Sequence, residues 1–431
     1  MRILWVTHDL FEAFLPYVKG RPTLGGSWIA PLFYLLHNEP DVKLGSITPV
    51  LNGEAQKKEI DNIIYYSVPM MKNDNIRNIN LRLASEYLFA INDFKPDIIH
   101  VHGTEKNFGL LRKFIDESIP VVCSIQGIVS PCYDNLKHSV ATVNIKKYRS
   151  IKNRLGRGGV NFALRKWKRY ILIEREIYNI NSYFVGRTMW DRAQLMSLNP
   201  EAVYFQGEEL LRAEFYTTKW EIDNCERHRI FVPSAASPLK GFHVLLKAAA
   251  ILKQDYPDVK IVAPLSTIQT KSPKWKDYLV SEDYANYVKT QIKELGLEGH
   301  VVFKKKLSAT EMAHEYCNAH VFVLPSFMEN SPNSLGESMM VGVPSVASAV
   351  GGVPSIVKDN ESSLLFSPGD HAYLAFQIKR IFSDDALAEK IGREARMIAQ
   401  KRHHIEHTIR QYMSIYSNII DHHHENIACA L

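Results

Sequence analysis

Two glutamates, Glu329 and Glu337, are the side chains of this sequence best placed to do chemistry. They lie in the stretch from Ser326 to Ile356, SFMENSPNSLGESMMVGVPSVASAVGGVPSI, on either side of a short segment rich in Asn and Ser. Carboxylates accept hydrogen bonds from the neighbouring hydroxyls of a sugar or a ribose. The pair therefore predicts a site for a hydroxyl-rich ligand.

The elements around the pair predict where it lies in a fold. An apolar run from Val321 to Leu324 leads into it, and a helix-compatible segment from Ser334 to Val341 follows. Strand-to-helix turns of this kind line the ligand crevice of an open α/β sheet. The helix N-terminus also offers N–H groups and a partial positive charge to an anion such as diphosphate. Together the two halves predict a nucleotide-diphosphate sugar as the ligand.

Glu337 has a second explanation. Ser334 and Glu337 have the spacing of a capping box, in which the acid satisfies N–H groups of its own helix. Glu329 has no such duty, although acids in exposed loops are often only solvated. The sequence leaves the ligand role and these structural roles open.

Lys240 is the basic candidate of the same half of the chain. It lies in Ser237-Pro238-Leu239-Lys240-Gly241, after the predicted strand Ile230 to Val232 and before a helix that begins near Phe242. A lysine there can neutralise the charge that grows on a leaving diphosphate. A plain turn lysine is the alternative.

Three features of the first half are weaker candidates. His100 and His102 alternate along a strand, so their rings share one face, and His102 is nearest the carboxyl end, either in a ligand crevice or as a satisfied structural histidine. Gln126 ends the next strand, where it can bind hydroxyls but cannot act as a general base near neutrality. Gly25-Gly26-Ser27 permits a close approach of backbone to ligand, although Gly pairs mostly mark turns.

Repeated βα units predict an α/β fold with parallel sheets, and 431 residues favour two domains. The polar stretch Thr217 to His228 predicts the linker between the domains. The expected organisation is an N-terminal domain over 1–216, a linker over 217–228, a C-terminal domain over 229–405 and a final helix and tail over 406–431. The strands are expected at Ile3 to Val6, Ile98 to Val101, Val121 to Ile125, Tyr183 to Val185, Ile230 to Val232, Val259 to Val262, Val301 to Phe303, Val321 to Leu324 and Ser345 to Ala347.

Composition narrows the class of protein. No apolar run approaches the roughly 20 residues that span a bilayer, and the N-terminus reads directly as a strand, so a cytoplasmic protein is expected. Five scattered cysteines favour reduced thiols over a disulfide framework or a zinc site. The histidines His422 to His424 are expected to form a frayed, solvated run rather than a metal site.

A basic segment suggests a partner. From Ile145 to Tyr170 there are ten Lys and Arg residues and no acid. Val160, Leu164, Trp167 and Ile171 recur at helical spacing, which predicts an amphipathic basic helix. Its basic face fits an anionic membrane surface or a lipid-phosphate acceptor. The alternative is a solvated basic face whose apolar side packs on its own domain, and nucleic acid is not expected, because no recognition motif accompanies the patch.

Several enzyme classes lack their motifs here. No Gly-x-Gly-x-x-Gly follows a strand, since Gly156-Arg-Gly-Gly lies inside the basic segment, and no Walker A loop occurs. These absences disfavour an NAD-dependent enzyme and a P-loop NTPase. The sequence also has no Asp-x-Asp, so a catalytic Mg²⁺ or Mn²⁺ held by that motif is not expected.

The Glu-x7-Glu turn, GVPSVAS, the Gly351-Gly352 pair and LLFSPGD resemble the retaining family 4 glycosyltransferases of GT-B fold. Further similarities occur upstream, in LKGFHVLLKAAAIL, IIHVHG and VGRTMWDRA. The resemblance implies two Rossmann-like parallel-sheet domains that face each other across a cleft, the last helix crossing back to the N-terminal domain. It also implies transfer of a sugar from a UDP- or GDP-sugar to a hydroxyl of a glycan or lipid-linked acceptor, with surface polysaccharide biosynthesis as the expected setting.

The resemblance also implies roles for individual residues. Glu337 would hold the ribose hydroxyls, Glu329 the transferred sugar, and Asn330 to Leu335 would donate backbone N–H groups to the diphosphate. Gly25 to Ser27 would lie near the donor phosphates or the acceptor. The candidate catalytic residues are Glu329, Lys240 and His102, and the candidate donor-binding residues are Lys240, Glu329, Asn330, Ser331, Asn333, Ser334, Leu335, Glu337 and Gln126.

The sequence departs from the family pattern at two places. The family usually has Gly-Arg six and five positions before the lysine, where this chain has Ser234 and Ala235, so one phosphate-binding guanidinium is missing. Gln126 stands where the family commonly has a histidine that contacts the donor sugar. These departures motivate a rival prediction, a catalytically silent nucleotide-sugar or glycan binding protein on the same fold.

Overall fold

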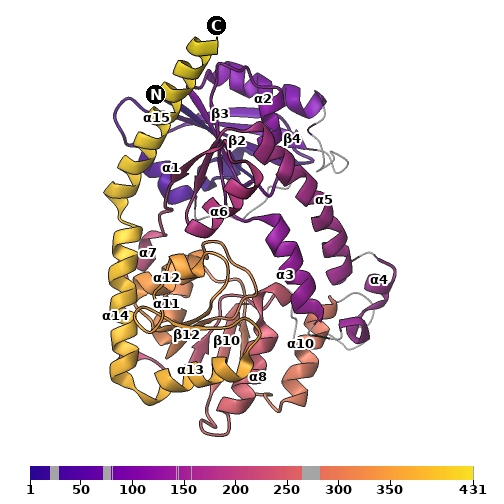
Figure 1. The fold of residues 1–431 in the computed structure, drawn as a ribbon, viewed down its shortest axis with the longest axis vertical. Coiled ribbons are helices and arrows are strands. Elements are labelled where there is room, and N and C mark those ends of the chain that lie inside the picture. Colours follow the sequence, from indigo (N-terminus) through magenta and orange to yellow (C-terminus); the bar gives the residue numbers. More distant parts are fainter. Residues whose placement is uncertain are drawn as a thin grey trace. The chain divides into compact units, whose positions relative to one another are not determined.

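The computed structural model divides the chain into two compact units (Figure 1). It describes residues 1–430 except 20–28, 71–78, 80, 142, 144, 157 and 265–281. Unit 1 comprises Met1–Val129, Arg169–Leu210 and His403–Leu431, and unit 2 comprises Ser130–Lys168 and Leu211–Arg402. Each unit is built around one sheet with helices on its faces.

The sheet of unit 1 has the strand order β3-β4-β2-β1-β5-β6-β7-β8. All neighbouring strands are parallel except the β3–β4 pair. The chain reverses its direction of winding at β1, which lies between β2 and β5, and such switch points form ligand crevices. The strands are β1 (Arg2–Val6), β2 (Lys43–Leu51), β3 (Gln56–Ile60), β4 (Ile63–Met70), β5 (Ile98–His102), β6 (Val121–Ser124), β7 (Tyr183–Gly186) and β8 (Val203–Gln206).

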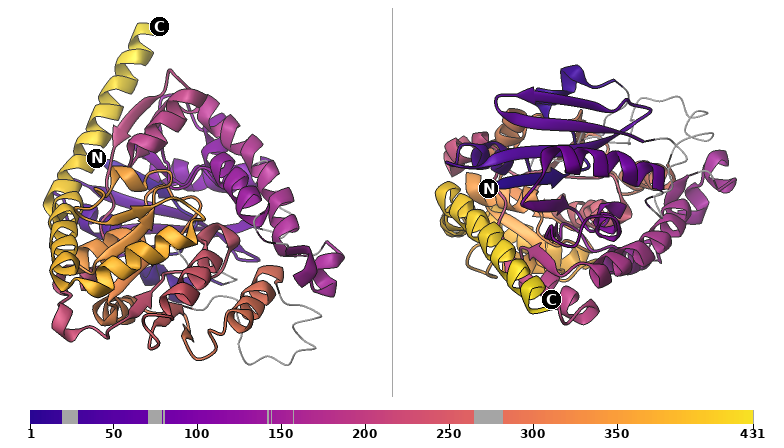
Figure 2. Two further views of the ribbon diagram at one scale, coloured as in Figure 1. Left: turned by 60° about the horizontal axis from the view of Figure 1, so that its bottom comes forward. Right: turned by 90° about the horizontal axis from the view of Figure 1, so that it is seen from above.

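The helices of unit 1 include the end of the chain, α15, which runs along this unit (Figures 1 and 2). Tyr416 on α15 accepts a hydrogen bond from Trp5 Nε1 at 3.2 Å, and its neighbours Tyr412 and Ile419 join the same apolar core as Trp5. The α-helices are α1 (Ala30–His37), α2 (Leu81–Phe94), α5 (Gly159–Ile180, from Arg169 on), α6 (Met189–Leu198) and α15 (Ile405–Ala430).

The sheet of unit 2 is wholly parallel, in the order β11-β10-β9-β12-β13-β14. Its strands are β9 (Arg229–Phe231), β10 (Lys260–Pro264), β11 (Val301–Lys304), β12 (Val321–Leu324), β13 (Ser345–Ser348) and β14 (Leu364–Phe366). Its helices are α3 (Val129–Ala141), α4 (Ile151–Arg154), α7 (Ala213–Thr217), α8 (Phe242–Leu252), α10 (Asp283–Glu294), α11 (Ala309–Asn318), α12 (Asn333–Val341), α13 (His371–Ser383) and α14 (Asp385–Arg402).

The α/β prediction is confirmed, and every predicted strand lies within a residue or two of an observed one. The prediction missed β2, β3, β4, β8 and β14. Two of these carry buried or exposed polar residues that hide the apolar pattern: β3 reads QKKEI at an exposed edge, and β2 buries Ser46 and Thr48. Thr48 is satisfied by Thr7 Oγ1 at 3.1 Å, a contact the local sequence does not reveal.

The unit boundaries differ from the expected domains of 1–216 and 229–405. Ser130–Lys168 belong to unit 2, where Asn286 Nδ2 donates to the backbone oxygen of Tyr148 at 3.1 Å. The expected linker 217–228 also packs on unit 2, because Trp220 is buried and its Nε1 donates to the backbone oxygen of Ala319 at 2.7 Å. The polar composition of the stretch concealed two buried apolar residues, Trp220 and Ile222.

The histidines near the end of the chain differ from their prediction. His422 and His423 belong to α15 rather than to a frayed run. Tyr183 OH lies 3.0 Å from His422 Nδ1, and His423 Nε2 lies 2.7 Å from the backbone oxygen of Glu117. They therefore fasten α15 to unit 1. Within the described ranges, no helix is long and apolar enough to span a bilayer.

Candidate functional site

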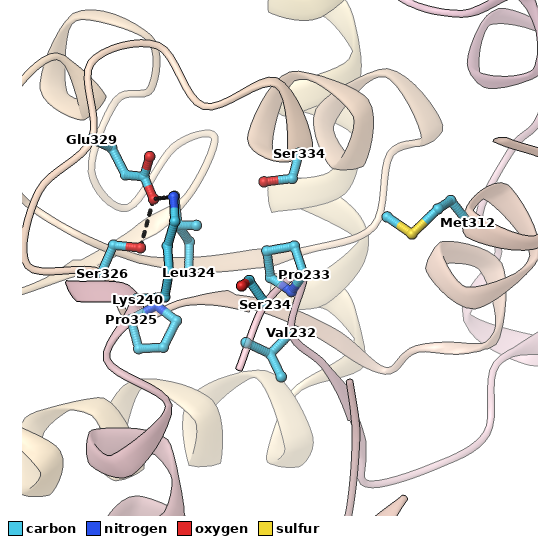
Figure 3. A pocket seen from close by; sticks show the side chains of 10 residues that line it. All are labelled: Val232, Pro233, Ser234, Lys240, Met312, Leu324, Pro325, Ser326, Glu329 and Ser334. Carbon is cyan, nitrogen blue, oxygen red and sulfur yellow. Dashed lines mark hydrogen bonds and ion pairs between the residues drawn. The ribbon is translucent and has the colours of Figure 1, made fainter. Parts of the chain in front are cut away.

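A pocket of about 240 Å³ opens in unit 2 beyond the carboxyl ends of the adjacent strands β9 and β12 (Figure 3). This is the place at which parallel α/β sheets bind ligands. Figure 3 shows Lys240, Ser326 and Glu329 grouped on one side and Met312 on the other. The lining residues are Val232, Pro233, Ser234, Lys240, Met312, Leu324, Pro325, Ser326, Glu329 and Ser334.

Lys240 and Glu329 meet inside this pocket as an ion pair. Lys240 Nζ donates to Glu329 Oε1 at 2.6 Å, and Ser326 Oγ donates to the same oxygen at 2.7 Å (Figure 3). Glu329 is nearly buried, whereas Lys240 keeps more than a third of its side chain exposed. The lysine can thus turn to an incoming phosphate while the carboxylate stays in place to accept from hydroxyls.

Two glycines fix the backbone that carries this pair. Gly241, with φ +66°, lies so close to Pro325 that a Cβ would sit 1.8 Å from the Pro325 oxygen. Gly351, with φ +49°, lies against Glu329, whose backbone oxygen would be 2.0 Å from a Cβ. Gly352 N donates to that oxygen at 3.1 Å. Only glycine allows these approaches, so the Gly351-Gly352 pair holds the Glu329 turn from behind.

Glu337 lies in α12, and its capping-box explanation is wrong. The helix begins at Asn333 with Pro332 as its N-cap, and no side chain caps it. Glu337 Oε1 instead accepts from Arg212 Nη2 at 2.7 Å, and Oε2 accepts from Tyr316 OH at 3.0 Å. Burial raises the pKa of the Glu337 carboxyl, while Arg212 and the two hydrogen bonds act to lower it.

The other predicted donor-binding residues of the turn lie between the two acids. Ser334, in the first turn of α12, lines the pocket, and its backbone oxygen accepts from Tyr316 OH at 3.1 Å. Asn330 is buried, and Ser331 Oγ accepts from Arg402 Nη2 at 3.4 Å. Asn333 and Leu335 belong to the same first turn of α12. The structure therefore brings the predicted turn residues together around a helix N-terminus, and Ser334 and Glu329 reach the pocket wall.

Ser234 and Ala235, the two positions at which the chain departs from the family's Gly-Arg, differ in their relation to the pocket. Ser234 lines the pocket, whereas Ala235 is buried and does not. Lys240 is the only basic side chain among the described residues that line it. Of these two positions, Ser234 is therefore the one that faces the pocket. Among the described residues no group of three or more His, Cys, Asp or Glu could hold a metal ion.

The histidines of unit 1 have different surroundings. His100 is structural, since its ring nitrogens lie 2.7 Å from Ser124 Oγ and 2.8 Å from Tyr416 OH. His102 packs on the Trp5 ring with centroids 4.0 Å apart, and its Nε2 is buried without a partner among the described residues. Burial and the neighbouring His100 hold the pKa of His102 well below its ordinary value, so the ring is neutral at physiological pH. It can form hydrogen bonds, but it is a weak general base.

A polar cluster that the sequence did not predict lies near Gln126 at the carboxyl ends of the unit 1 strands. Arg187, which follows β7, donates to the backbone oxygen of Gln126 at 3.2 Å and to Glu209 Oε2 at 2.5 Å. Glu105, after β5, is a further acid there, and burial raises the pKa of its carboxyl. The position of Arg187 directly after an apolar strand was the available signal. Gly25, Gly26 and Ser27 lie outside the described residues.

Comparison with known proteins shows what part of the chain is similar to. Residues 218–397 match the family profile of glycosyl transferases group 1. A D-inositol 3-phosphate glycosyltransferase of Nocardioides sp. is 29% identical over 191 residues, which are 42% of this chain and 39% of that protein. The chain thus spans about two fifths of the length of the first curated relatives it matches.

Two solved structures match nearly the whole chain. Sucrose-phosphate synthase of Thermosynechococcus elongatus has a TM-score of 0.70 at 15% identity, over 97% of this chain and 99% of that one. Anabaena HepE, in complex with UDP-glucose, has a TM-score of 0.66 at 16% identity, over 97% and 100%. At this identity the likeness shows the fold of both units together with their order in the chain.

Proposed function

We propose, because the chain has the GT-B fold and its residues 218–397 match glycosyl transferases group 1, that the protein is a retaining glycosyltransferase. It moves a sugar from a nucleotide-diphosphate sugar to a hydroxyl of a glycan or lipid-linked acceptor. The observation that carries the proposal is the Lys240–Glu329 ion pair in a pocket beside the first turn of α12. One pocket thereby offers a cation to diphosphate and a carboxylate to hydroxyls.

In the proposed reaction the bond from the sugar's anomeric carbon to the diphosphate oxygen breaks, and a bond from that carbon to the acceptor oxygen forms on the same face. The electron pair of the broken bond leaves on the diphosphate, where Lys240 and the N–H groups of α12 stabilise it. The acceptor proton passes to the departing phosphate oxygen, so no strong protein base is needed. Glu329 orients the sugar hydroxyls, and no metal is invoked.

The donor test uses UDP-glucose first, since a protein of the same fold, Anabaena HepE, was solved in complex with it. Other UDP- and GDP-sugars follow in the same thermal-shift screen. A donor present at about 100 times its Kd stabilises the fold by about 2.7 kcal/mol. Stabilisation by a nucleotide sugar, followed by release of nucleotide when an acceptor is added, supports the proposal. A chain that no nucleotide sugar stabilises would contradict it.

The acceptor and the location belong to the same proposal. A lipid-linked acceptor of surface polysaccharide biosynthesis would fit the basic segment 145–170, and the proposed location is the cytoplasm, at the inner face of the membrane. Nucleic acid is not proposed as a partner. A panel of lipid-linked and soluble glycans, each tested for transfer of labelled sugar, identifies the acceptor class.

A catalytically silent binding protein is the second candidate, and Ser234 is the observation that favours it. With one cation lining the pocket, diphosphate would be held but its departure would be less assisted. Tight binding of a nucleotide sugar, without release of nucleotide in the presence of any acceptor or of water, would support the silent binding protein.

Replacing Ser234 by arginine tests how much the missing cation matters. A guanidinium at this place can bind diphosphate oxygens in a bidentate manner, so we expect Ser234→Arg to lower the Kd for UDP-glucose about tenfold. Isothermal calorimetry measures the change. Ala235→Arg tests the other of the two positions. Because Ala235 is buried and does not line the pocket, this variant is expected to give no gain in affinity and to lower the melting temperature, which is measured alongside. A gain at Ala235 and none at Ser234 would reverse this assignment.

The raised pKa of Glu337 predicts a pH dependence of donor binding. Only the carboxylate accepts from two ribose hydroxyls, so affinity for UDP-glucose falls as the pH is lowered through the pKa of Glu337, which burial has moved upward. Arg212 opposes that rise, and Arg212→Ala therefore shifts the loss of affinity to a higher pH still. Calorimetry from about pH 5 to about pH 8 measures both profiles. Glu337→Gln should abolish this titration, whereas an unchanged profile in Arg212→Ala would disprove the coupling.

A further inference from the structure

The basic segment forms α4, a short loop and the start of α5 at the edge of unit 2, next to α10 (Figures 1 and 2). Its inner side is fastened to unit 2. Glu282 accepts from Lys152 Nζ at 3.3 Å and from the backbone N of Gly159 at 2.9 Å. Asp283 accepts from the backbone N of Val160 at 3.3 Å. The segment is therefore a fixed platform rather than a loose arm.

The apolar residues predicted for the helix pack against the protein, as expected if the apolar side of the helix is covered by its own domain. Val160 is buried, and Leu164, Trp167 and Ile171 are partly buried. A different apolar set remains at the surface. Leu155 is 67% exposed, Phe162 47% and Leu172 68%. Some apolar side chains of the segment therefore do not pack on the protein and are exposed to solvent.

These exposed apolar residues alternate with cations. On α5, Phe162, Arg169 and Leu172 share a face, since they are spaced by seven and three residues. Arg154 precedes Leu155, and Arg165 Nη2 ties the start of α5 to the oxygen of Gly156 at 3.1 Å. Arg154, Lys168 and Arg169 are exposed and form no ion pair within the described part of the chain. The acids that would neutralise this face are absent from 145–170.

We propose that this face docks on the surface of a bilayer rich in anionic phospholipid. The α4–α5 surface is defined here as Arg154, Leu155, Phe162, Arg169 and Leu172. Leucine and phenylalanine side chains enter the boundary of the acyl chains, and the arginines pair with lipid phosphates at headgroup depth. The inference rests on the proposed location at the inner face of the membrane and deepens it, because it names the side chains and the class of lipid that make the contact. Vesicle binding needs neither a donor nor an acceptor, so it is tested separately from sugar transfer.

A polyanion such as RNA would satisfy the same cations, but it fits this face less well. Single-stranded nucleic acid is bound by cations together with aromatic rings on which bases stack. The exposed apolar residues here are mainly aliphatic, with Phe162 as the single aromatic ring of the surface. Exposed leucines gain nothing from phosphate, whereas they gain from leaving water for a bilayer.

Vesicle flotation tests the proposal with the full chain. The probes are phosphatidylcholine vesicles with and without phosphatidylglycerol. We expect binding to the anionic vesicles only, with a partition coefficient that falls about tenfold in Leu155→Ser/Phe162→Ser and about tenfold in Arg154→Gln/Arg169→Gln. All changed residues are exposed, so the melting temperature should stay near that of the unchanged chain.

The matched control lies on α2, where Leu81 is 79% and Phe89 69% exposed without a comparable run of cations. Leu81→Ser/Phe89→Ser should bind anionic vesicles as the unchanged chain does. The proposal fails if anionic vesicles are not bound, or if the control loses as much binding as the surface variants. It also fails if the chain binds RNA but not anionic vesicles. Stabilisation by UDP-glucose, measured in the same variants, reports the donor site separately and should be unaffected.

Discussion

Glu329→Ala is expected to lower the rate of sugar transfer by about 10²–10³-fold, the usual effect of removing one preorganised charged group from a reaction site. Glu329 lines the pocket, and its carboxylate holds both Lys240 Nζ and Ser326 Oγ. Its loss removes the acceptor for sugar hydroxyls and the partner that holds Lys240 at the pocket before a donor binds. Turnover of labelled donor, measured with saturating acceptor, gives the magnitude.

Folding should survive this substitution, because Lys240 is exposed enough to be solvated once its partner is gone. Ser326→Ala is the matched control, since it removes one hydrogen bond but leaves the ion pair, and its rate should fall far less. Lys240→Met should resemble Glu329→Ala, and the double variant should be little worse than either, because the two residues act as one unit. Additive losses would show that they act separately.

Glu337→Ala is expected to raise the KM for the nucleotide sugar about 10–100-fold, with a smaller effect on kcat. Hydrogen bonds to a charged group contribute about 1.5–3 kcal/mol each, and the ribose hydroxyls would lose one or two of them. Initial rates at varied donor concentration separate KM from kcat. Tyr316→Phe is the control, because it keeps the carboxylate and removes only the hydrogen bonds that Tyr316 OH donates to Oε2 and to the backbone oxygen of Ser334.

The same variant decides whether Glu337 is structural. Since Pro332 is the N-cap of α12 and no side chain caps the helix, the start of α12 does not depend on Glu337. The melting temperature of Glu337→Ala should therefore fall by only a few degrees, a cost that comes mainly from Arg212 losing its partner. Early melting with an unchanged KM would assign the residue to the fold.

The sequence predicted the strands whose apolar runs are continuous, such as Ile98 to Val101 and Val321 to Leu324. It did not predict β2 or β3, because their polar residues are satisfied by other strands or by solvent rather than by neighbours in the sequence. For the same reason, the predicted domain boundaries differ from the boundaries of the two compact units. Ser130–Lys168 join unit 2 through contacts such as Gly159 with Glu282, 123 residues apart.

In the candidate site, the sequence by itself determined the turn that carries Glu329 and Ser334, and the lysine loop. These follow from local rules: a buried strand, a glycine where the backbone must pass closely, and a helix that starts after Pro332. Tertiary structure alone decided what the side chains do there. Glu337 meets Arg212 across 125 residues, Lys240 meets Glu329 across 89, and both pairs depend on how helices and strands pack.

The basic segment shows the same division. Its charge and its helical period are properties of the sequence. Which apolar residues pack on unit 2 and which stay in solvent depended on the position of α10, since the acids Glu282 and Asp283 fix one side of the platform and leave Leu155 and Phe162 on the other. A periodic pattern predicts an apolar face, but only packing determines whether that face is covered.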